Sequence, residues 1–86
     1  MVRGRLYTER EVRRLNFLRK LKYNDVLIIG KQSYKPQRIL VSNVSNGILY
    51  GTLLYLKGNR ALTSEFKPSL ESIALGRKKL SISRLQ

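Results

Sequence analysis

The fold is decided by residues 46–59, which read NGILYGTLLYLKGN. The Asn46-Gly47 pair predicts a type I′ hairpin turn, because both central residues of that turn need a positive φ and these two residue types tolerate it. Residues 48–57 predict a strand that is apolar on both faces, packed on one side by the core and on the other by a helix. Gly51 interrupts this strand, which is typical of a bulge or sharp bend that curls a small sheet.

Four further strands are predicted on either side of this one, each bounded by turn-forming residues. We expect them at residues 25–30, 38–45, 60–66 and 80–85. Gly58-Asn59 predicts the tight turn that leads into the strand at 60–66. Residues 68–76 fit either a short helix capped by Ser69 or a strand leading into a hairpin at residues 76–79, and we favour the hairpin.

A helix is predicted from about residue 9 to residue 22, a stretch free of glycine and proline. Thr8 and Glu11 have the spacing of a capping box, in which each side chain bonds the other residue's backbone N–H. Apolar residues then recur every three positions, at Val12, Leu15, Leu18 and Leu21. Such a pattern gives a broad buried stripe and leaves a basic outer face. Residues 1–7 form a basic N-terminal arm, and residues 8–86 form a single domain with a β meander at about 25–85.

A helix followed by about five short strands, with a glycine bend in the middle of the sheet, resembles the small-barrel group of SH3-like, Tudor-type, KOW-type and Sm-like folds. The resemblance covers roughly residues 25–85. It implies a mainly β fold with an N-terminal helix, built as a small SH3-like or Sm-like barrel, and a binding module for nucleic acid or peptides. The alternative is an α+β open antiparallel sheet covered by the helix.

The charge of the chain is strongly positive and lies mostly at its two ends. The 86 residues hold 18 Lys and Arg against 5 Asp and Glu, a net charge of +13. Residues 1–22 carry eight basic and two acidic side chains, and residues 76–86 carry four basic and none acidic. This charge repels itself unless an anionic partner neutralises it, so we expect a nucleic-acid partner.

The candidate nucleic-acid-binding residues fall into three groups. The arm and the helix supply arginines and a lysine that could reach phosphates. The loop after the first strand offers a tyrosine suited to base stacking between two lysines, and a predicted turn holds three adjacent cations. The residues are Arg3, Arg5, Arg10, Arg13, Arg14, Arg19, Lys20, Lys31, Tyr34, Lys35, Arg77, Lys78 and Lys79.

Enzymatic chemistry is not expected. The chain has no cysteine and no histidine, which excludes disulfides, thiolate metal sites, a cysteine nucleophile and the commonest general base. Asp25, Glu65 and Glu71 lie in different predicted elements, and Glu9 and Glu11 are explained as acidic residues of the first turn of the helix. No GxxxxGK phosphate loop is present. We expect no cofactor and no metal. The apolar runs are too short to span a membrane and no signal peptide is evident, so we expect an intracellular protein, cytoplasmic or nucleoid-associated, with no membrane partner.

The sequence therefore predicts a non-catalytic nucleic-acid-binding protein that contacts mainly the phosphate backbone, with duplex DNA slightly preferred over RNA. The alternative is a protein-interaction module that docks on an acidic partner surface, for example as an inhibitor or assembly factor of a nucleic-acid enzyme. A homodimer, formed by pairing of an exposed strand edge with a second copy, also remains open.

Overall fold

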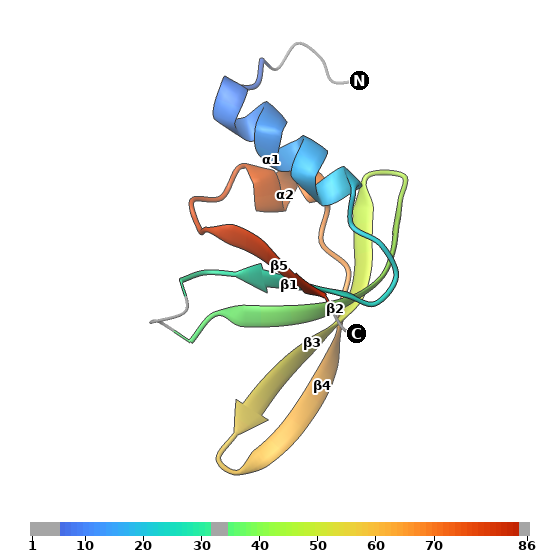
Figure 1. Cartoon of the computed structure of the whole chain (residues 1–86), viewed down its shortest axis with the longest axis vertical. Helices are drawn as coiled ribbons and strands as arrows, with labels where there is room; N and C mark the ends of the chain where they lie inside the picture. The colour runs from blue at the N-terminus through green and yellow to red at the C-terminus, as the bar shows by residue number, and fades with distance from the viewer. Residues whose placement is uncertain (1–5, 32–34, 85–86) are drawn as a thin grey trace.

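Five antiparallel strands form a single sheet in the order β4-β3-β2-β1-β5, and two helices lie on one side of it (Figure 1). The structure is a computed structural model that describes residues 6–31 and 35–84. The elements in chain order are α1 (Glu9–Arg19), β1 (Asp25–Ile29), β2 (Gln37–Ser45), β3 (Ile48–Lys57), β4 (Arg60–Phe66), α2 (Leu70–Ala74) and β5 (Leu80–Arg84). The prediction of a mainly β chain with an N-terminal helix is confirmed.

The sheet is open and is not closed into a barrel. β4 and β5 are its two edge strands. The hairpin of β3 and β4 extends away from the helices and from β5, so the two edges do not meet (Figure 1). This arrangement agrees with the predicted alternative of an open antiparallel sheet covered by the helix.

The β2–β3 hairpin has the turn that the sequence predicts. Asn46 and Gly47 both have positive φ, at 52° and 75°. The predicted irregularity lies in β2, opposite Gly51. Val41 pairs with Gly51 and Asn43 pairs with Tyr50, so Ser42 is the additional residue of a bulge.

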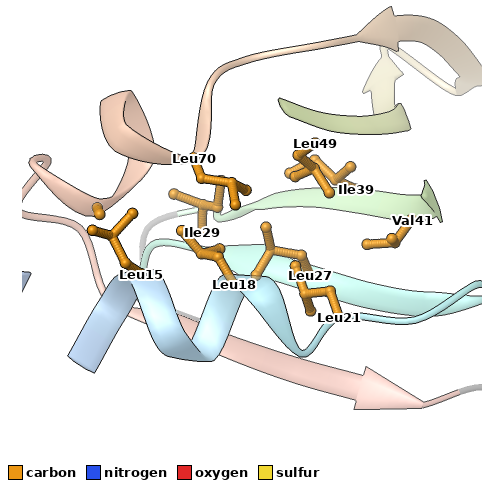
Figure 2. Close-up of a cluster of buried hydrophobic side chains, with 10 residues drawn as sticks. Leu15, Leu18, Leu21, Leu27, Ile29, Ile39, Val41, Leu49 and Leu70 are labelled. Atoms are coloured by element: carbon orange, nitrogen blue, oxygen red, sulfur yellow. The ribbon is translucent and has the colours of Figure 1, made fainter. Parts of the chain in front are cut away.

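The core lies between α1, α2 and the inner face of the sheet (Figure 2). Three leucines of the N-terminal segment contribute to it, with Leu18 completely buried and Leu15 and Leu21 nearly so. Opposite them lie Leu27 and Ile29 of β1, together with residues of β2, β3 and α2. Leu15, Leu18 and Leu21 of the predicted apolar period are therefore buried, whereas Val12 at its start is 42% exposed, so the buried stripe is shorter than predicted.

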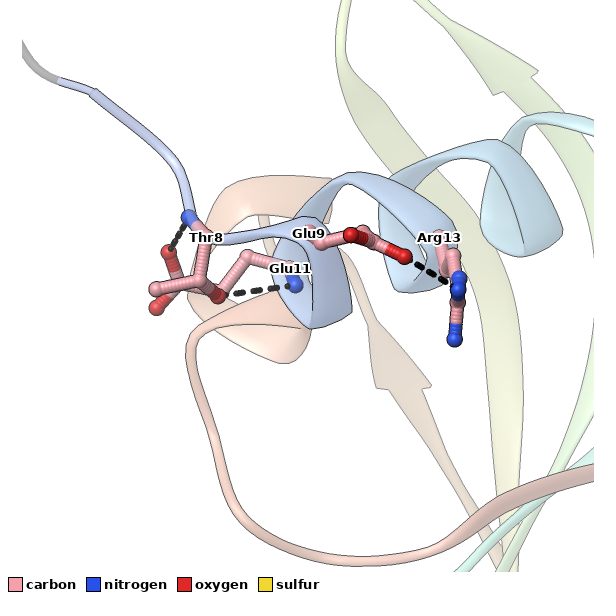
Figure 3. Close-up of polar contacts among 4 residues, drawn as sticks. All are labelled: Thr8, Glu9, Glu11 and Arg13. Atoms are coloured by element: carbon pink, nitrogen blue, oxygen red, sulfur yellow. Dashed lines mark hydrogen bonds and ion pairs between the residues drawn. The ribbon is translucent and has the colours of Figure 1, made fainter.

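The start of α1 confirms the predicted capping box (Figure 3). The hydroxyl of Thr8 accepts a bond from the Glu11 N–H at 3.2 Å, and the Glu11 carboxylate accepts one from the Thr8 N–H at 2.9 Å. The predicted end at residue 22 is wrong, since α1 ends at Arg19. The chain then turns sharply because the buried Asp25 carboxylate accepts a bond from the Lys22 N–H at 2.9 Å and Asn24 adopts a positive φ of 74°.

The favoured hairpin after residue 68 is also wrong, because this stretch contains the short helix α2. Ser69 caps it by accepting a bond from the Ser72 N–H at 3.1 Å. Leu70 and Ala74, one turn apart, are both buried in the core shared with α1. Ile73 also packs against this core while Ser72 is exposed, which is the i, i+3, i+4 spacing of a helix, whereas a strand would place Ser72 on the same face as Leu70 and Ala74.

The prediction that β3 is buried on both faces is wrong, because the core and the helices lie on one side of the sheet and Leu49 is the one buried residue of β3. Leu49 is fully buried, whereas residues 54–57 are exposed. β2 begins at Gln37, and its pairing with β3 begins at Arg38, which lies opposite Leu54. β3 and β4 continue beyond this point with only each other as partners, joined by the turn at Gly58 and Asn59.

We expect Gly51→Ala to lower the free energy of unfolding by about 1–3 kcal/mol, the usual effect of overpacking a well-packed site. An added Cβ would lie 2.7 Å from the Leu40 carbonyl oxygen and 2.8 Å from an Ile39 methyl carbon, so β2 and β3 would have to move apart. Urea unfolding measures the loss. Ser42→Ala, at the exposed bulge residue, serves as the control and should stay within about 0.5 kcal/mol of the parent. Equal stability of both variants would contradict the close approach at Gly51.

Candidate functional site

One end of the sheet gathers basic residues from three segments that are distant in sequence. Because β1 and β5 are antiparallel neighbours, the end of β1 lies beside the start of β5, with Ile29 opposite Leu80. The Gly30 N–H donates a bond to the Lys79 carbonyl oxygen at 2.8 Å, which ties the two following loops together. α1 passes over the same end of the sheet.

Two adjoining surface depressions occupy this end, and we call them together the basic groove. One, of about 320 Å³, lies between the loops, and the other, of about 480 Å³, lies between the loops and α1. Lys31, Arg77 and Lys79 line both depressions, so the two are continuous. The basic side chains lining the groove are Arg10, Arg13, Arg14, Lys31, Lys35, Arg77, Lys78 and Lys79. Among residues 6–31 and 35–84, no acidic side chain lines the groove.

Carboxylates do not neutralise the groove because the five acidic residues of the chain have contacts elsewhere. Two of these residues lie in the first turn of α1, and the other three lie at the start of β1, on β4 and in α2. These contacts are Glu9 with Arg13, Glu11 with the Thr8 N–H, Asp25 with the Lys22 N–H, Glu65 with Lys67, and Glu71 with the Tyr7 hydroxyl. Among them only Glu9 meets a groove residue, in an exposed pair one helical turn apart that is weakly stabilising (Figure 3).

Arg14 holds the groove together instead of projecting freely into it. Its guanidinium donates to the backbone carbonyls of Ala74 at 2.9 Å, Ile73 at 3.0 Å and Lys78 at 2.8 Å. It thus caps the end of α2 and fixes the loop that carries Arg77, Lys78 and Lys79. Burial lowers the pKa of the Arg14 guanidinium below its ordinary value, and the charge of Arg10 lowers it further. The three carbonyl bonds offset this cost of burying a cation.

The structure brings together most of the residues that the sequence singled out. Of the described candidates, Arg19 and Lys20 lie apart, exposed at the far end of α1 and outside the groove lining. Arg3, Arg5 and Tyr34 lie outside the described residues. Sequence reasoning missed the apolar part of the groove lining, which includes Phe17, Pro36 and Leu80. It also missed that Arg14 binds backbone carbonyls. In the sequence, Arg14 does not differ from the other basic residues of the amphipathic helix.

Two other kinds of site, a metal centre and a membrane-spanning helix, are absent from the described part of the chain. Residues 6–31 and 35–84 contain no cluster of three or more potential metal-ligating side chains of the His, Cys, Asp or Glu type. Within the same ranges, neither helix has the length and apolar character needed to cross a membrane.

Comparison with known proteins gives no match, whether to a protein-family model, to a curated protein or to a solved structure.

We expect Arg14→Met to lower the free energy of unfolding by about 2 kcal/mol, because the substitution leaves three carbonyl oxygens without their charged donor. Urea unfolding at pH 7 measures the difference. Arg13→Met is the matched control, since it removes the same group from an exposed ion pair and should change stability by less than about 0.5 kcal/mol. If the two variants are equally stable, the carbonyl contacts of Arg14 carry no stability.

Proposed function

We propose that this protein binds nucleic acid without catalysis, and that the basic groove is its main contact surface. The proposal rests on one observation: in the part of the chain that the structure describes, eight cations from α1 and two loops converge on a groove that no acidic residue lines. Like charges held together repel one another, and a polyanion relieves that repulsion while releasing its own counter-ions. The contacts are mainly to phosphates, with duplex DNA preferred over RNA.

The placement of the acidic residues supports a binding role over a catalytic one. General acid–base chemistry needs a carboxylate or another base beside the bound substrate. Each of the five carboxylates has a structural contact, and among these contacts only that of Glu9 with Arg13 involves a residue of the groove lining. The chain has no histidine or cysteine. The groove offers positive charge and donors, which suffice to hold phosphates.

We further propose that the sheet is a variant of the small-barrel modules, SH3-like or Sm-like, that the sequence resembles. The consecutive antiparallel meander, the bulge at Ser42 and the close approach at Gly51 are devices that curl such a sheet. In this interpretation α1 and its basic side chains cover the end of the curled sheet.

A salt titration of binding to a fluorescent DNA duplex tests the groove. Each phosphate contact contributes about −0.9 to the slope of log K against log salt for duplex DNA. We therefore expect Lys31→Ala/Lys79→Ala to weaken binding and to make the slope shallower by about 2. The same titration with single-stranded DNA and with RNA of equal length tests the preference for duplex DNA.

The matched control is Arg19→Ala/Lys20→Ala, which removes the same two charges outside the groove. Its slope should stay close to that of the parent protein. If both double variants change the slope equally, binding follows net charge and the groove is not the site. An absence of binding by the folded parent at about 50 mM salt would overturn the proposed function itself.

A further inference from the structure

A second groove, of about 1,010 Å³, lies where β2 begins and the β3–β4 hairpin continues beyond it. We call it the hairpin groove, and its lining consists of residues 35–38, 53–56 and 61–63 together with Gly58. Strand pairing places Arg38, Leu54 and Thr63 in one row across β2, β3 and β4. In the next row toward the hairpin tip, Leu56 lies opposite Ala61. Because alternate residues of a strand share a face, these five side chains lie on one face of the sheet.

The leucines of this face are exposed because neither helix covers them. Leu53 packs against the core, so its neighbour Leu54 points to the side of the sheet away from α1 and α2. Leu54 is 36% exposed and Leu56 is 74% exposed, on a hairpin that extends away from the helices (Figure 1). β2 pairs with β3 from Arg38 onward, which leaves Leu56 with a pairing partner on β4 alone among the described residues. Exposed apolar side chains grouped in this way are typical of a surface that another molecule covers.

The charge of the hairpin groove is positive. Lys35 and Arg38 line it and are both exposed, and Arg38 lies directly opposite Leu54. Within the described ranges no acidic residue lines the groove, and Glu65, further along β4, has its ion pair with Lys67 at 3.3 Å. The groove therefore favours a ligand that combines negative charge with apolar surface.

The hairpin groove continues from the basic groove, since Lys35, Pro36 and Gln37 line both. A nucleic acid held in the basic groove can therefore extend onto the hairpin. A duplex keeps its base faces stacked and offers the leucines nothing to cover. Unpaired nucleotides expose these faces, which pack against apolar side chains and arginine planes while their phosphates bind cations.

We propose that the hairpin groove binds unpaired nucleotides that continue from the nucleic acid held in the basic groove. The inference rests on the proposed function, because the basic groove anchors the same ligand. Leu54 and Leu56 cover base faces, and Arg38 beside them binds a phosphate or lies against a base plane. A second copy of the chain is a poorer occupant, since it brings the same net charge of +13. The preferred ligand is thus a duplex with a single-stranded extension.

The test compares two fluorescein-labelled DNA duplexes that each carry a single-stranded tail of about ten nucleotides. One tail is made of thymidine and the other of abasic sites, so the two have equal numbers of phosphates and differ in their bases. Both probes are made in the two possible tail polarities, and the same duplex without a tail is the reference. Fluorescence anisotropy measures binding to the full chain at about 50 mM salt.

We expect the thymidine tail to bind about tenfold more tightly than the abasic tail in at least one polarity, as for one or two stacked bases. Equal binding of the two tails in both polarities would overturn the inference while leaving the proposed function intact. If the folded parent binds none of the probes, the proposed function fails and the inference fails with it.

Leu54→Ser/Leu56→Ser assigns the base contact to the hairpin groove, with circular dichroism to verify the fold. This variant should lose the preference for the thymidine tail and bind the duplex without a tail as the parent does. The matched control is Val12→Ser/Tyr23→Ser, which alters two side chains that are 42% and 74% exposed and lie outside the lining of both grooves. The control should keep the thymidine preference.

Lys31→Ala/Lys79→Ala should weaken the binding of both tailed probes by the same factor, because it removes charge from the basic groove and leaves the hairpin unchanged. A thymidine preference that survives in the leucine variant would place the base contact elsewhere and overturn the assignment. An oligomer of the parent protein that the leucine variant dissociates would also overturn it, because a second copy would then cover the leucines.

Discussion

Leu15 and Leu18 of α1, together with Leu21 just after it, pack in one core with β1 and α2, and the rest of the structure depends on this packing. The contact orients the helix, so that Arg10 and Arg13 face the loops that follow β1 and precede β5. It also selects a helix for residues 70–74, since Leu70, Ile73 and Ala74 all pack into the same core, which an alternating strand does not allow. The hydrophobic contact thereby decides where the positive charge accumulates, because cations cannot share the buried side.

Holding the cations of the basic groove close together costs electrostatic free energy. Cations gathered in one groove repel one another, and of the five carboxylates Glu9 pairs with one of these cations, Arg13, while the other four have their contacts elsewhere. Arg14 shows how the backbone helps to support the arrangement, since it gives its guanidinium to three carbonyl oxygens of α2 and the following loop. The remaining cations line a groove left without acidic side chains, which is the physical basis of the proposed phosphate contacts.

The two ends of the sheet differ in surface composition. Cations line the basic groove, whereas Leu54, Tyr55 and Leu56 are exposed at the end of the β3–β4 hairpin. The open topology explains this exposure. Because the sheet does not close, the end of the β3–β4 hairpin stays outside the core and keeps its apolar residues exposed. A closed sheet would bury much of that surface.

The sequence by itself determined the features that depend on neighbouring residues. The turn at Asn46 and Gly47, the capping box of Thr8 and Glu11, and the strand ranges all follow from local backbone preferences and short side-chain bonds. The tertiary structure alone decided the features that depend on distant residues: the pairing of β1 with β5, the helix at residues 70–74, the end of α1 at Arg19 and the bonding of Arg14. Each of these depends on a partner far along the chain or on a buried contact, such as that of Asp25, which a local pattern does not specify.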